Sequence, residues 1–577
     1  MRTVRQSARW QLLAFSLAAP CFGVGRCDEP PPPPDGLLDG ARHAYYGKDQ
    51  GGWVDLRRQF RSVNLYGRRG QGQLLDVLDG NFAAAQKKCE EELSRNPDDL
   101  ESLFNLAVAR AHLKDTDGAV NAMTQAIEGG LPFDRFLAGP RRTLEPLRKT
   151  EAFQTYAARY DLQLLHGPML GCLTDESVKI WVRTLDEVSV RVVANSPVAF
   201  ALPVLSTTSS TSSKADYTAI VEIDGLKPDT SYSYELLLDG VSVSLTERPR
   251  FRTHPRRSVG ARWDVVFGGG AKYTPANERM WDTILARGPR ALLMLGDNVY
   301  IDLPESFGEF HKYTYYRRQS QPSFRKLVRS VPVSAIWDDH DCAIGDSWLG
   351  PYPDKPAWKP SLLEGFRTNW NNPGYGTEKW PGCWFKSSIA DVDFFFLDGR
   401  YYRTNPYGEN PSMLGPVQKA WLLDELQKSR ATFKVIASPV PWSFNTKGKS
   451  RDTWNGFRKE RAEIFAFLER HKIDGIVLIS ADRHRSDARR IDRDGAYPLY
   501  EFESSCLTND RRHSLASGAI FGYNKQPSFG LLRFDTTKSD PTVTYEIVSI
   551  DGEVIHRLMV EKSEISHAVA KARPGGL

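Results

Sequence analysis

The 577-residue sequence predicts a multidomain chain in which an α-helical region and a β-sandwich precede a larger α/β domain. Three observations predict this order. Apolar residues recur with helical spacing over residues 73–160, and they alternate with polar residues over 165–255. Over residues 260–565, short apolar runs end at polar or glycine-rich clusters, a pattern typical of α/β domains.

The composition is that of a folded protein. Apolar residues make up 41% and charged residues 25%, with 45 Gly and 36 Pro, which excludes collagen, coiled coil and bulk disorder. The formal net charge of +5 is too small to predict nucleic-acid-specific binding. The seven cysteines are too few for a disulfide framework, and no pair has zinc-finger spacing.

The N-terminus has the layout of a secretory signal peptide over residues 1–27. Arginines precede an apolar run from Trp10 to Val24 that contains small residues toward its end. The run is about 15 residues long, shorter than the roughly 20 that span a bilayer. We therefore expect export by the general route to the periplasm or the extracellular space. We expect no transmembrane segment after cleavage, and a linker over residues 28–72.

The helical region over residues 73–160 resembles tetratricopeptide (TPR) repeats. Leu103, Leu106 and Ala107 lie close to positions of a roughly 34-residue helix-turn-helix repeat, and Ala85 falls about one period earlier. Small residues at such offsets let two antiparallel helices approach closely. The pattern predicts either a helical hairpin packed on the rest of the chain or a groove for a peptide or protein partner, and it leaves both open.

Residues 165–255 predict a β-sandwich of short strands. Apolar residues alternate with polar ones at Val178, Ile180 and Val182, and a Ser/Thr-rich turn follows at residues 206–213. The segment from Leu226 to Tyr234 resembles a fibronectin-like motif in which a tyrosine packs and hydrogen-bonds at a corner of the sandwich. The resemblance implies a structural role for this tyrosine.

In the α/β domain, polar side chains follow the predicted strands. The run Ala291–Leu295 precedes Asp297, Val333–Trp337 precedes an Asp-Asp-His-Asp segment, and Gly475–Ile479 precedes residues 480–484. The carboxyl ends of such strands form the edge where α/β proteins bind ligands. Several carboxylates at one edge would repel one another unless cations neutralised them. Oxygen-rich ligands favour hard cations such as ferric iron, calcium, manganese or magnesium.

The segments Gly296–Tyr300, Trp337–Asp341 and Ser480–His484, in this order behind a β-sandwich, resemble the alkaline phosphatase D (PhoD-like) branch of the metallophosphoesterases. One segment alone is weakly specific, whereas three in order, each after a predicted strand, are strongly specific. The resemblance covers the chain from about residue 165 to the C-terminus. It implies an α/β/β/α core, a hydrolase acting on phosphoric esters, and ferric iron with calcium as the metal ions.

The resemblance also implies roles for individual residues. Asp297 would bridge two metal positions, Tyr300 would supply a phenolate ligand, and His340 would lie near the leaving group. An arginine after the last strand would pair with phosphoryl oxygens through its planar fork. The implied metal ligands are Asp297, Tyr300, Asp339, Asp482 and His484, and the implied catalytic residues are Asp339, His340, Asp341 and Arg483.

The sequence departs from the family pattern at two ligand positions. Gly270 stands where the branch often has a Cys ligand, and a metal-binding Asn is replaced around Gly345, where Asp346 offers an oxygen instead. We further expect Arg317, Arg318 and Arg325, on a predicted helix, to form mainly a solvated face, with the entry of one of them into the cleft as the alternative.

The leading hypothesis is an exported, metal-dependent phosphoesterase. A metal-activated hydroxide would attack phosphorus in phosphate mono- or diesters. The same two metal ions would stabilise the phosphoryl group of either ester class. The alternative is a catalytically impaired relative that acts as a binding module through its helical and β-sandwich regions. Gly270 and Gly345 favour the alternative, whereas the retained ligand set opposes it.

Overall fold

The structure is a computed structural model that describes residues 43–45, 53–55, 70–159, 163–197, 200–245, 247–303, 307–343 and 345–567. The expected signal peptide and most of the expected linker lie outside the described residues. Strands β1 (His43–Tyr45) and β2 (Trp53–Asp55) pair antiparallel. Within the described ranges, no helix combines the length and the apolar character that crossing a membrane requires.

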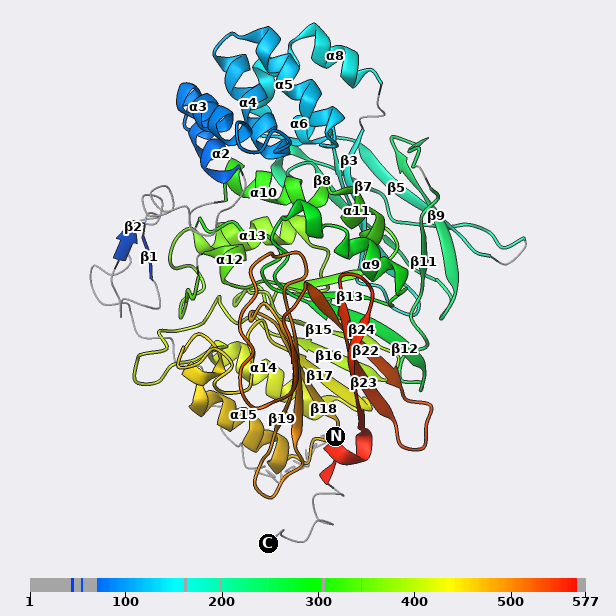
Figure 1. Ribbon diagram of the computed structural model, residues 1–577. Coiled ribbons are helices and arrows are strands. Elements are labelled where there is room, and N and C mark those ends of the chain that lie inside the picture. The colour runs from blue at the N-terminus through cyan, green and yellow to red at the C-terminus, as the bar shows by residue number, and fades with distance from the viewer. Residues whose placement is uncertain are drawn as a thin grey trace, which may run out of the picture. The chain divides into compact units, whose positions relative to one another are not determined.

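Helices α2–α8 form the N-terminal region (Figure 1). Helix α4 begins after Asp99, whose carboxylate accepts hydrogen bonds from the backbone N–H groups of Glu101 and Ser102. Ala85 and Ala107 are fully buried between helices, as the small-residue pattern predicts. The helices are α2 (Gln71–Leu78), α3 (Phe82–Leu93), α4 (Leu100–His112), α5 (Thr116–Glu128), α6 (Arg135–Ala138), α7 (Arg141–Arg148) and α8 (Glu151–Ala157).

Two antiparallel sheets follow the helices. One has the order β3-β4-β8, and the other has the order β10-β9-β5-β6, with β7 on β5 and β11 on β9. Val182 of β4 and Val192 of β5 belong to one buried apolar cluster, so the two sheets pack face to face. The hydroxyl of Tyr232 accepts a hydrogen bond from the Lys227 N–H at 2.9 Å. The strands are β3 (Leu164–Gly171), β4 (Val178–Thr184), β5 (Ser189–Asn195), β6 (Val204–Leu205), β7 (Ser209–Ser210), β8 (Thr218–Ile223), β9 (Ser231–Leu238), β10 (Val241–Ser242) and β11 (Arg250–Arg252).

The remaining chain forms two larger mixed sheets with the orders β14-β13-β12-β22-β23-β24 and β15-β16-β17-β18-β20-β19-β21. Strands β12–β14 are parallel, and so are β16–β18 and β20. The strands are β12 (Arg262–Gly268), β13 (Leu292–Leu295), β14 (Val333–Ile336), β15 (Phe385–Ile389), β16 (Val392–Phe396), β17 (Phe433–Ala437), β18 (Ile476–Ser480), β19 (Ser486–Ile491), β20 (Leu499–Ser504), β21 (Ala519–Tyr523), β22 (Ser528–Asp535), β23 (Thr542–Ser549) and β24 (Val554–Glu561).

Aromatic side chains join these two sheets. Phe534 of β22 packs against Phe433 of β17 with ring centroids 5.7 Å apart, and Phe502 of β20 stacks on Tyr545 of β23 at 4.6 Å. Figure 1 shows α14 and α15 beside the second sheet and α9 and α11 beside the first, which gives α/β/β/α layers. The helices are α9 (Met280–Ala286), α10 (Glu309–Gln319), α11 (Pro322–Val328), α12 (Asp339–Cys342), α13 (Lys359–Asn369), α14 (Gly415–Lys428) and α15 (Arg458–Arg470).

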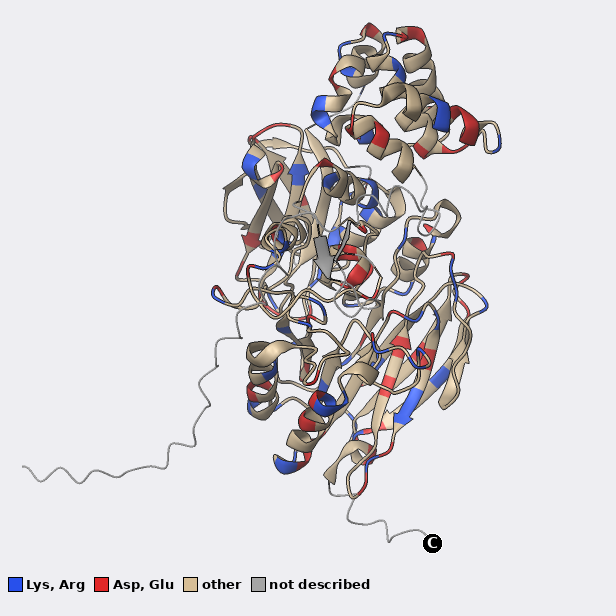
Figure 2. Ribbon diagram, turned by 90° about the vertical axis from the view of Figure 1, so that its left-hand side faces the viewer, with Lys and Arg blue, Asp and Glu red and all other residues tan. Residues whose placement is uncertain are grey.

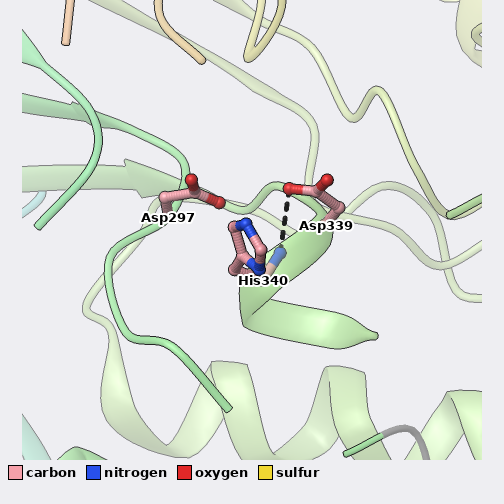
Figure 3. Close-up of side chains that lie close together, drawn as sticks. All are labelled: Asp297, Asp339 and His340. Atoms are coloured by element: carbon pink, nitrogen blue, oxygen red, sulfur yellow. Dashed lines mark hydrogen bonds between the residues drawn. The ribbon is translucent and has the colours of Figure 1, made fainter. Parts of the chain in front are cut away.

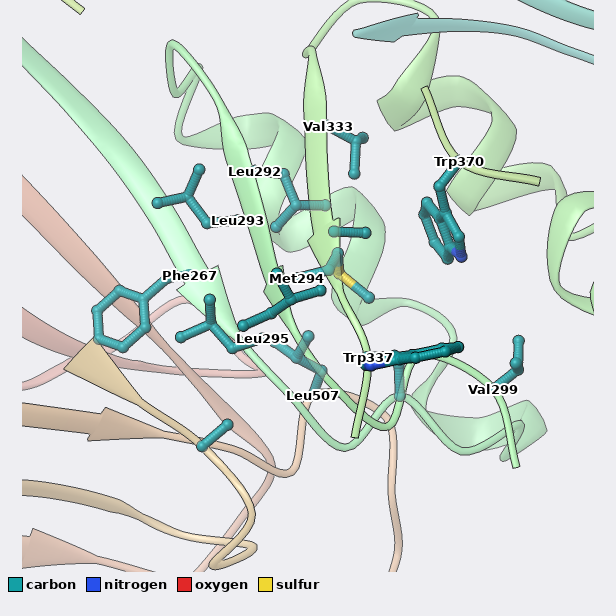
Figure 4. Packing of buried hydrophobic residues seen from close by; sticks show 14 of the residues in the cluster. Phe267, Leu292, Leu293, Met294, Leu295, Val299, Val333, Trp337, Trp370 and Leu507 are labelled. Atoms are coloured by element: carbon teal, nitrogen blue, oxygen red, sulfur yellow. The ribbon is translucent and has the colours of Figure 1, made fainter. Parts of the chain in front are cut away.

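The strands that carry the predicted site rest on a continuous apolar core. Figure 4 shows Leu292 and Met294 of β13 among this cluster, with Trp337 and Val299 close to the end of β14. All four residues are at most 3% exposed. This packing fixes the strand ends from which the site loops begin.

The prediction that the arginines of α10 form a solvated face is wrong. Arg317 and Arg318 are only 5% and 2% exposed. Arg318 hydrogen-bonds the carboxylate of Glu278 and, at 2.5 Å, the carbonyl of Ala271, while Arg317 lies 3.8 Å from Glu101 of α4. The N-terminal helices cover α10, so these guanidinium groups meet carboxylates instead of water.

Candidate metal centre

Loops after β13, β14 and β18 bring most of the predicted site residues together. A parallel bridge between Gly269 and Ser505 joins the two larger sheets at this edge. The backbone of Asp297, Asp482 and His484 has φ of 53°, 74° and 49°, the left-handed region that non-glycine residues seldom adopt. Such strained positions cluster at functional sites, where the surrounding fold maintains them.

Three of the predicted ligands form one compact donor set. The Tyr300 hydroxyl lies 3.0 Å from Asp297 Oδ2 and 3.4 Å from His484 Nε2, and the latter two atoms are 4.0 Å apart. A point equidistant from these atoms lies about 2 Å from each, which matches metal–nitrogen and metal–oxygen bonds of roughly 2.0–2.2 Å. The geometry accommodates a single metal ion.

The electrostatics of this donor set also fit a cation. Burial and the neighbouring Asp339 raise the pKa of Asp297 to about 8, although His340 opposes the shift. Burial holds the pKa of His484 well below its ordinary value, which keeps the imidazole in the neutral form that binds metals. Asp297 Oδ1 and His484 Nδ1 are buried and have no hydrogen-bond partner within the described part of the chain. A bound cation would compensate the buried carboxylate.

Asn509 adjoins this donor set and was not predicted from the sequence. Its Nδ2 donates to the Tyr300 hydroxyl at 2.7 Å and lies 3.5 Å from His484 Nε2. Its Oδ1 accepts a hydrogen bond from the backbone N–H of Arg511 at 2.9 Å, which fixes the orientation of the amide. Asn509 lies in a loop several residues beyond β20, so no strand-end pattern marks it.

Helix α12 is a single turn that carries the predicted Asp-His-Asp segment. Asp341 Oδ2 accepts from the Asp338 N–H at 2.9 Å, and Oδ1 accepts from the N–H groups of Asn298 and Val299 at 3.0 Å each. Burial raises the pKa of Asp341 to about 7, against these hydrogen bonds. The Asp341 carboxylate therefore holds the Asp297 loop against α12, and both of its oxygens face backbone donors.

His340 lies beside the donor set. Figure 3 shows it with Asp297 and Asp339, and these three residues offer ligand atoms within 4.8 Å of one another. His340 Nδ1 pairs with the buried carboxylate of Asp302 at 2.5 Å, which leaves Nε2 for the site. The His340 ring also stacks on Tyr300, with centroids 4.6 Å apart. Asp302 was missed because it follows a loop rather than a strand.

A second acidic cluster adjoins the first and consists of Asp339, Asp346 and Asp452. Arg400 donates to Asp452 Oδ1 at 2.6 Å and lies 3.7 Å from Asp339 Oδ2. Arg400 and His340 lower the pKa of Asp339 although burial would raise it. The Lys447 ammonium donates to Asp346 and Asp452. Asp452 and Lys447 lie in the long loop after β17, and Arg400 follows β16. The sequence-based prediction missed all three, although these strands end at the same edge of the sheet.

The other predicted residues lie further from the three-atom set. Asp482 Oδ1 is 3.6 Å from Lys447 Nζ, and its Oδ2 is 3.5 Å from Arg483. Arg483 is 8% exposed and also donates to the carbonyl of Thr446 at 3.4 Å. Asp482 and Arg483 therefore line the site on the side of the second cluster.

Gly270 faces the donor set without supplying a ligand. A Cβ atom there would lie 3.7 Å from His484 Cδ2 and 3.0 Å from the backbone nitrogen of Cys506. The φ of Gly270 is 70°, so a side chain would also strain the backbone.

The layered fold and its acidic edge define a metallophosphoesterase-like core. The solved structure titled "Structure of PhoD" matches with a TM-score of 0.57 and 15% identity, over 70% of this chain and 91% of that chain. The purple acid phosphatase PPD1 from yellow lupin (Lupinus luteus) seeds matches with a TM-score of 0.52 and 11% identity, over 69% of this chain and 75% of that chain. These likenesses establish the fold.

Sequence comparison identifies the branch. The family model for PhoD-like phosphatase matches residues 379–544, and a domain of unknown function (DUF7800) matches residues 161–256. Alkaline phosphatase D of Bacillus subtilis (strain 168) is 28% identical over 317 residues, which is 47% of this chain and 54% of that protein. The aligned segment thus spans about half of that relative. Residues 379–544 thus match the PhoD-like phosphatase family that the sequence motifs predicted, whereas the TPR-like character of residues 73–160 stays a prediction.

Proposed function

We propose that this chain is a metal-dependent phosphoesterase that hydrolyses phosphate mono- and/or diesters. The observation that carries the proposal is the compact set formed by Asp297, Tyr300 and His484, in which Asp297 Oδ1 and His484 Nδ1 are buried without a hydrogen-bond partner among the described residues. This set lies beside an Asp302–His340 pair, in a chain whose residues 379–544 match the PhoD-like phosphatase family model. The combination suits ester hydrolysis better than passive binding.

The donor set suits a transition metal. A phenolate, a carboxylate and an imidazole fit an ion such as ferric iron, and calcium takes oxygen ligands only. Ferric iron is therefore our proposal for the ion at this set, whereas calcium, which the sequence resemblance also implies, would need a second position lined by oxygen atoms alone. When bound, such ions supply positive charge that stabilises the phosphoryl group and lowers the pKa of water.

The protein's own residues would bind the ester and handle the proton. Asp302 accepts the Nδ1 proton of His340, which lies with Asp297 and Asp339 at the site. In its doubly protonated imidazolium form, His340 would donate the Nε2 proton to the departing alkoxide and keep the Nδ1 proton on the bond to Asp302. Arg483 lies at the rim and offers a planar pair of N–H groups to phosphoryl oxygens.

The roles proposed for the N-terminal segments are more limited. Export rests on residues 1–27, which lie outside the described residues, and we propose a periplasmic or extracellular protein on that sequence alone. The region of residues 165–255 keeps its proposed fibronectin-like character. Figure 2 shows basic and acidic residues interspersed along the ribbon, so charge gives no ground for naming a macromolecular partner.

The proposal is tested by measuring metal content and hydrolysis together. Chelator-treated protein is reloaded, its bound metal is quantified, and an aryl phosphate monoester and a diester are assayed. We expect Asp297→Ala to lower both metal affinity and turnover. The loss should exceed the roughly 10–100-fold that is typical when a residue hydrogen-bonded to a metal ligand is replaced. Asp494→Ala, at an exposed turn, should change neither.

Full metal occupancy and activity in Asp297→Ala would contradict the assigned ligand role. Metal-replete wild-type protein that hydrolyses neither ester would contradict the proposed function and favour the binding-module alternative.

A further inference from the structure

We infer that the ammonium group of Lys447 takes one of the two cation positions at this edge, so that the chain binds a metal ion only at the Asp297–Tyr300–His484 set. The inference concerns the site of the proposed function and rests on its metal dependence. It does not depend on hydrolysis, because it predicts a metal count.

The geometry of Lys447 is that of a cation shared among carboxylates. Its Nζ donates to Asp346 Oδ1 at 2.7 Å and to Asp452 Oδ2 at 2.8 Å, and it lies 3.6 Å from Asp482 Oδ1. These carboxylates come from three loops, after α12, β17 and β18. An ammonium group has three N–H donors and can address all three carboxylates at once.

The charges around this position favour an ammonium over a second metal ion. Arg400 and Arg403 each donate to Asp452 Oδ1 at 2.6 Å, so Lys447 is the third cation at that carboxylate. A divalent ion there would have to displace these donors and leave buried positive charges unpaired. In contrast, no lysine or arginine in the described ranges forms an ion pair with Asp297, whose neighbour in that role is His484 at 4.0 Å.

The same arrangement explains a departure of the sequence from its family. The expected Asn ligand is missing near Gly345, and Asp346 stands next to it. A neutral amide would suit a metal ion, whereas the Asp346 carboxylate serves as the counter-ion of Lys447. Asp346, in the loop after α12, therefore pairs with the ammonium group of Lys447 and not with a second metal ion.

The count of bound ions tests this inference. Chelator-treated protein is dialysed against Mn²⁺, freed of excess ion, and analysed for metal by mass spectrometry. We expect about one ion per wild-type chain and about two per Lys447→Met chain, because the substitution keeps the side-chain length and removes the charge. Lys447→Arg, which keeps a cation, and Lys449→Met, at an exposed neighbouring position, should each bind about one.

Two ions per wild-type chain would overturn the inference, and so would none. A folded Lys447→Met chain that still binds one ion would overturn it as well, with circular dichroism as the check on folding. Should that variant fail to fold, the wild-type and Lys447→Arg counts still decide. Absence of hydrolysis with a wild-type count of one would refute the proposed function and leave this inference standing.

Discussion

At the scale of single residues, the hydrogen bond between Asp302 and His340 Nδ1 determines the chemistry open to this imidazole. If Nε2 protonates the leaving group, His340→Ala should slow hydrolysis of an alkyl phosphate by about 10²–10⁴-fold. A nitrophenyl phosphate should be affected much less, because nitrophenolate hardly needs a proton. Paired rate measurements on the two esters check this, with metal content measured in parallel.

Equal rate losses for both esters with the metal retained would remove the acid role and leave electrostatic stabilisation of the phosphoryl group. A collapse of metal occupancy would instead identify His340 as a ligand. A drop in stability with unchanged relative rates would make its bond to Asp302 purely structural.

The buried carboxyl of Asp297 predicts a pH dependence of stability in the metal-free chain. Burial raises the pKa of Asp297 to about 8 in the folded state, against about 3.9 for an unfolded Asp. Between these values the folded state binds more protons, so the stabilisation is complete below about pH 4 and is lost as the pH rises through 8. We expect the free energy of unfolding to fall by up to about 1.4 kcal/mol per pH unit more steeply than in Asp297→Asn.

Urea unfolding of both metal-free proteins between about pH 5 and 8 measures this difference. Asp341 is present in both proteins, so its own titration largely cancels. Metal-loaded wild-type protein should lose the excess slope, because a cation stabilises the Asp297 carboxylate. If the free energy of unfolding changes equally with pH in the metal-free wild-type and Asp297→Asn proteins, Asp297 stays ionised in the folded state.

Residues that follow a strand directly were predictable from the sequence, whereas their partners were not. Asp297 and His484 follow apolar runs, and parallel strands bring such positions to one edge. Asp302, Asn509 and Lys447 lie in long loops whose paths depend on tertiary contacts. No local periodicity marks the point where such a loop returns to the site.

At the scale of secondary structure, helix α10 shows how burial overrides a polar pattern. The carboxylate of Glu101 on α4 is 1% exposed, accepts two hydrogen bonds from Arg135 of α6 at 2.8 and 3.0 Å, and hydrogen-bonds Tyr313 of α10. Burial would raise the pKa of Glu101, but Arg135 and Arg317 lower it. This network explains why basic residues of α10 face inward.

Glu101→Gln should therefore destabilise the protein strongly. The substitution removes the carboxylate that pairs with the buried guanidinium group of Arg135, and breaking a buried ion pair in this way costs about 3–5 kcal/mol. Denaturant unfolding measures the loss. Glu91→Gln, which removes an exposed carboxylate 3.9 Å from Lys87, should cost less than about 1 kcal/mol. A similar small loss for both variants would mean that the Glu101 network contributes little.

The strands were predictable, but their pairing was not. The run Val333–Trp337 corresponds to β14, and the run Gly475–Ile479 corresponds to β18. The pairing of β12 with β22 joins segments more than 260 residues apart in an antiparallel register, from Arg262–Asp535 to Phe267–Gly530. Hydrophobic alternation determines which face of a strand is buried, but it does not encode the neighbour that completes the sheet.

At the scale of the whole molecule, the N-terminal helices and the α/β domain share one apolar core. Phe104 of α4 packs against Tyr313 of α10 with ring centroids 5.4 Å apart, and one buried cluster extends from Leu74 to Ile565. The amide of Gln71 on α2 donates to the backbone carbonyl of Tyr300 at 2.7 Å. The helical region is thus part of the scaffold that holds a predicted metal ligand.

A chain that begins at residue 163 should consequently be unstable and should bind metal weakly. It would expose Tyr313 and Arg317, which are now buried, and the Tyr300 loop would lose its bond from Gln71. Thermal unfolding and size-exclusion chromatography should show a lower melting temperature or aggregation. Gln71→Ala in the full chain separates the two effects, because it removes the bond to Tyr300 and retains the core. We expect it to weaken metal binding with a small loss of stability, of about 1–3 kcal/mol. A truncated chain with the melting temperature and metal affinity of the full chain would show that the helices form an independent module.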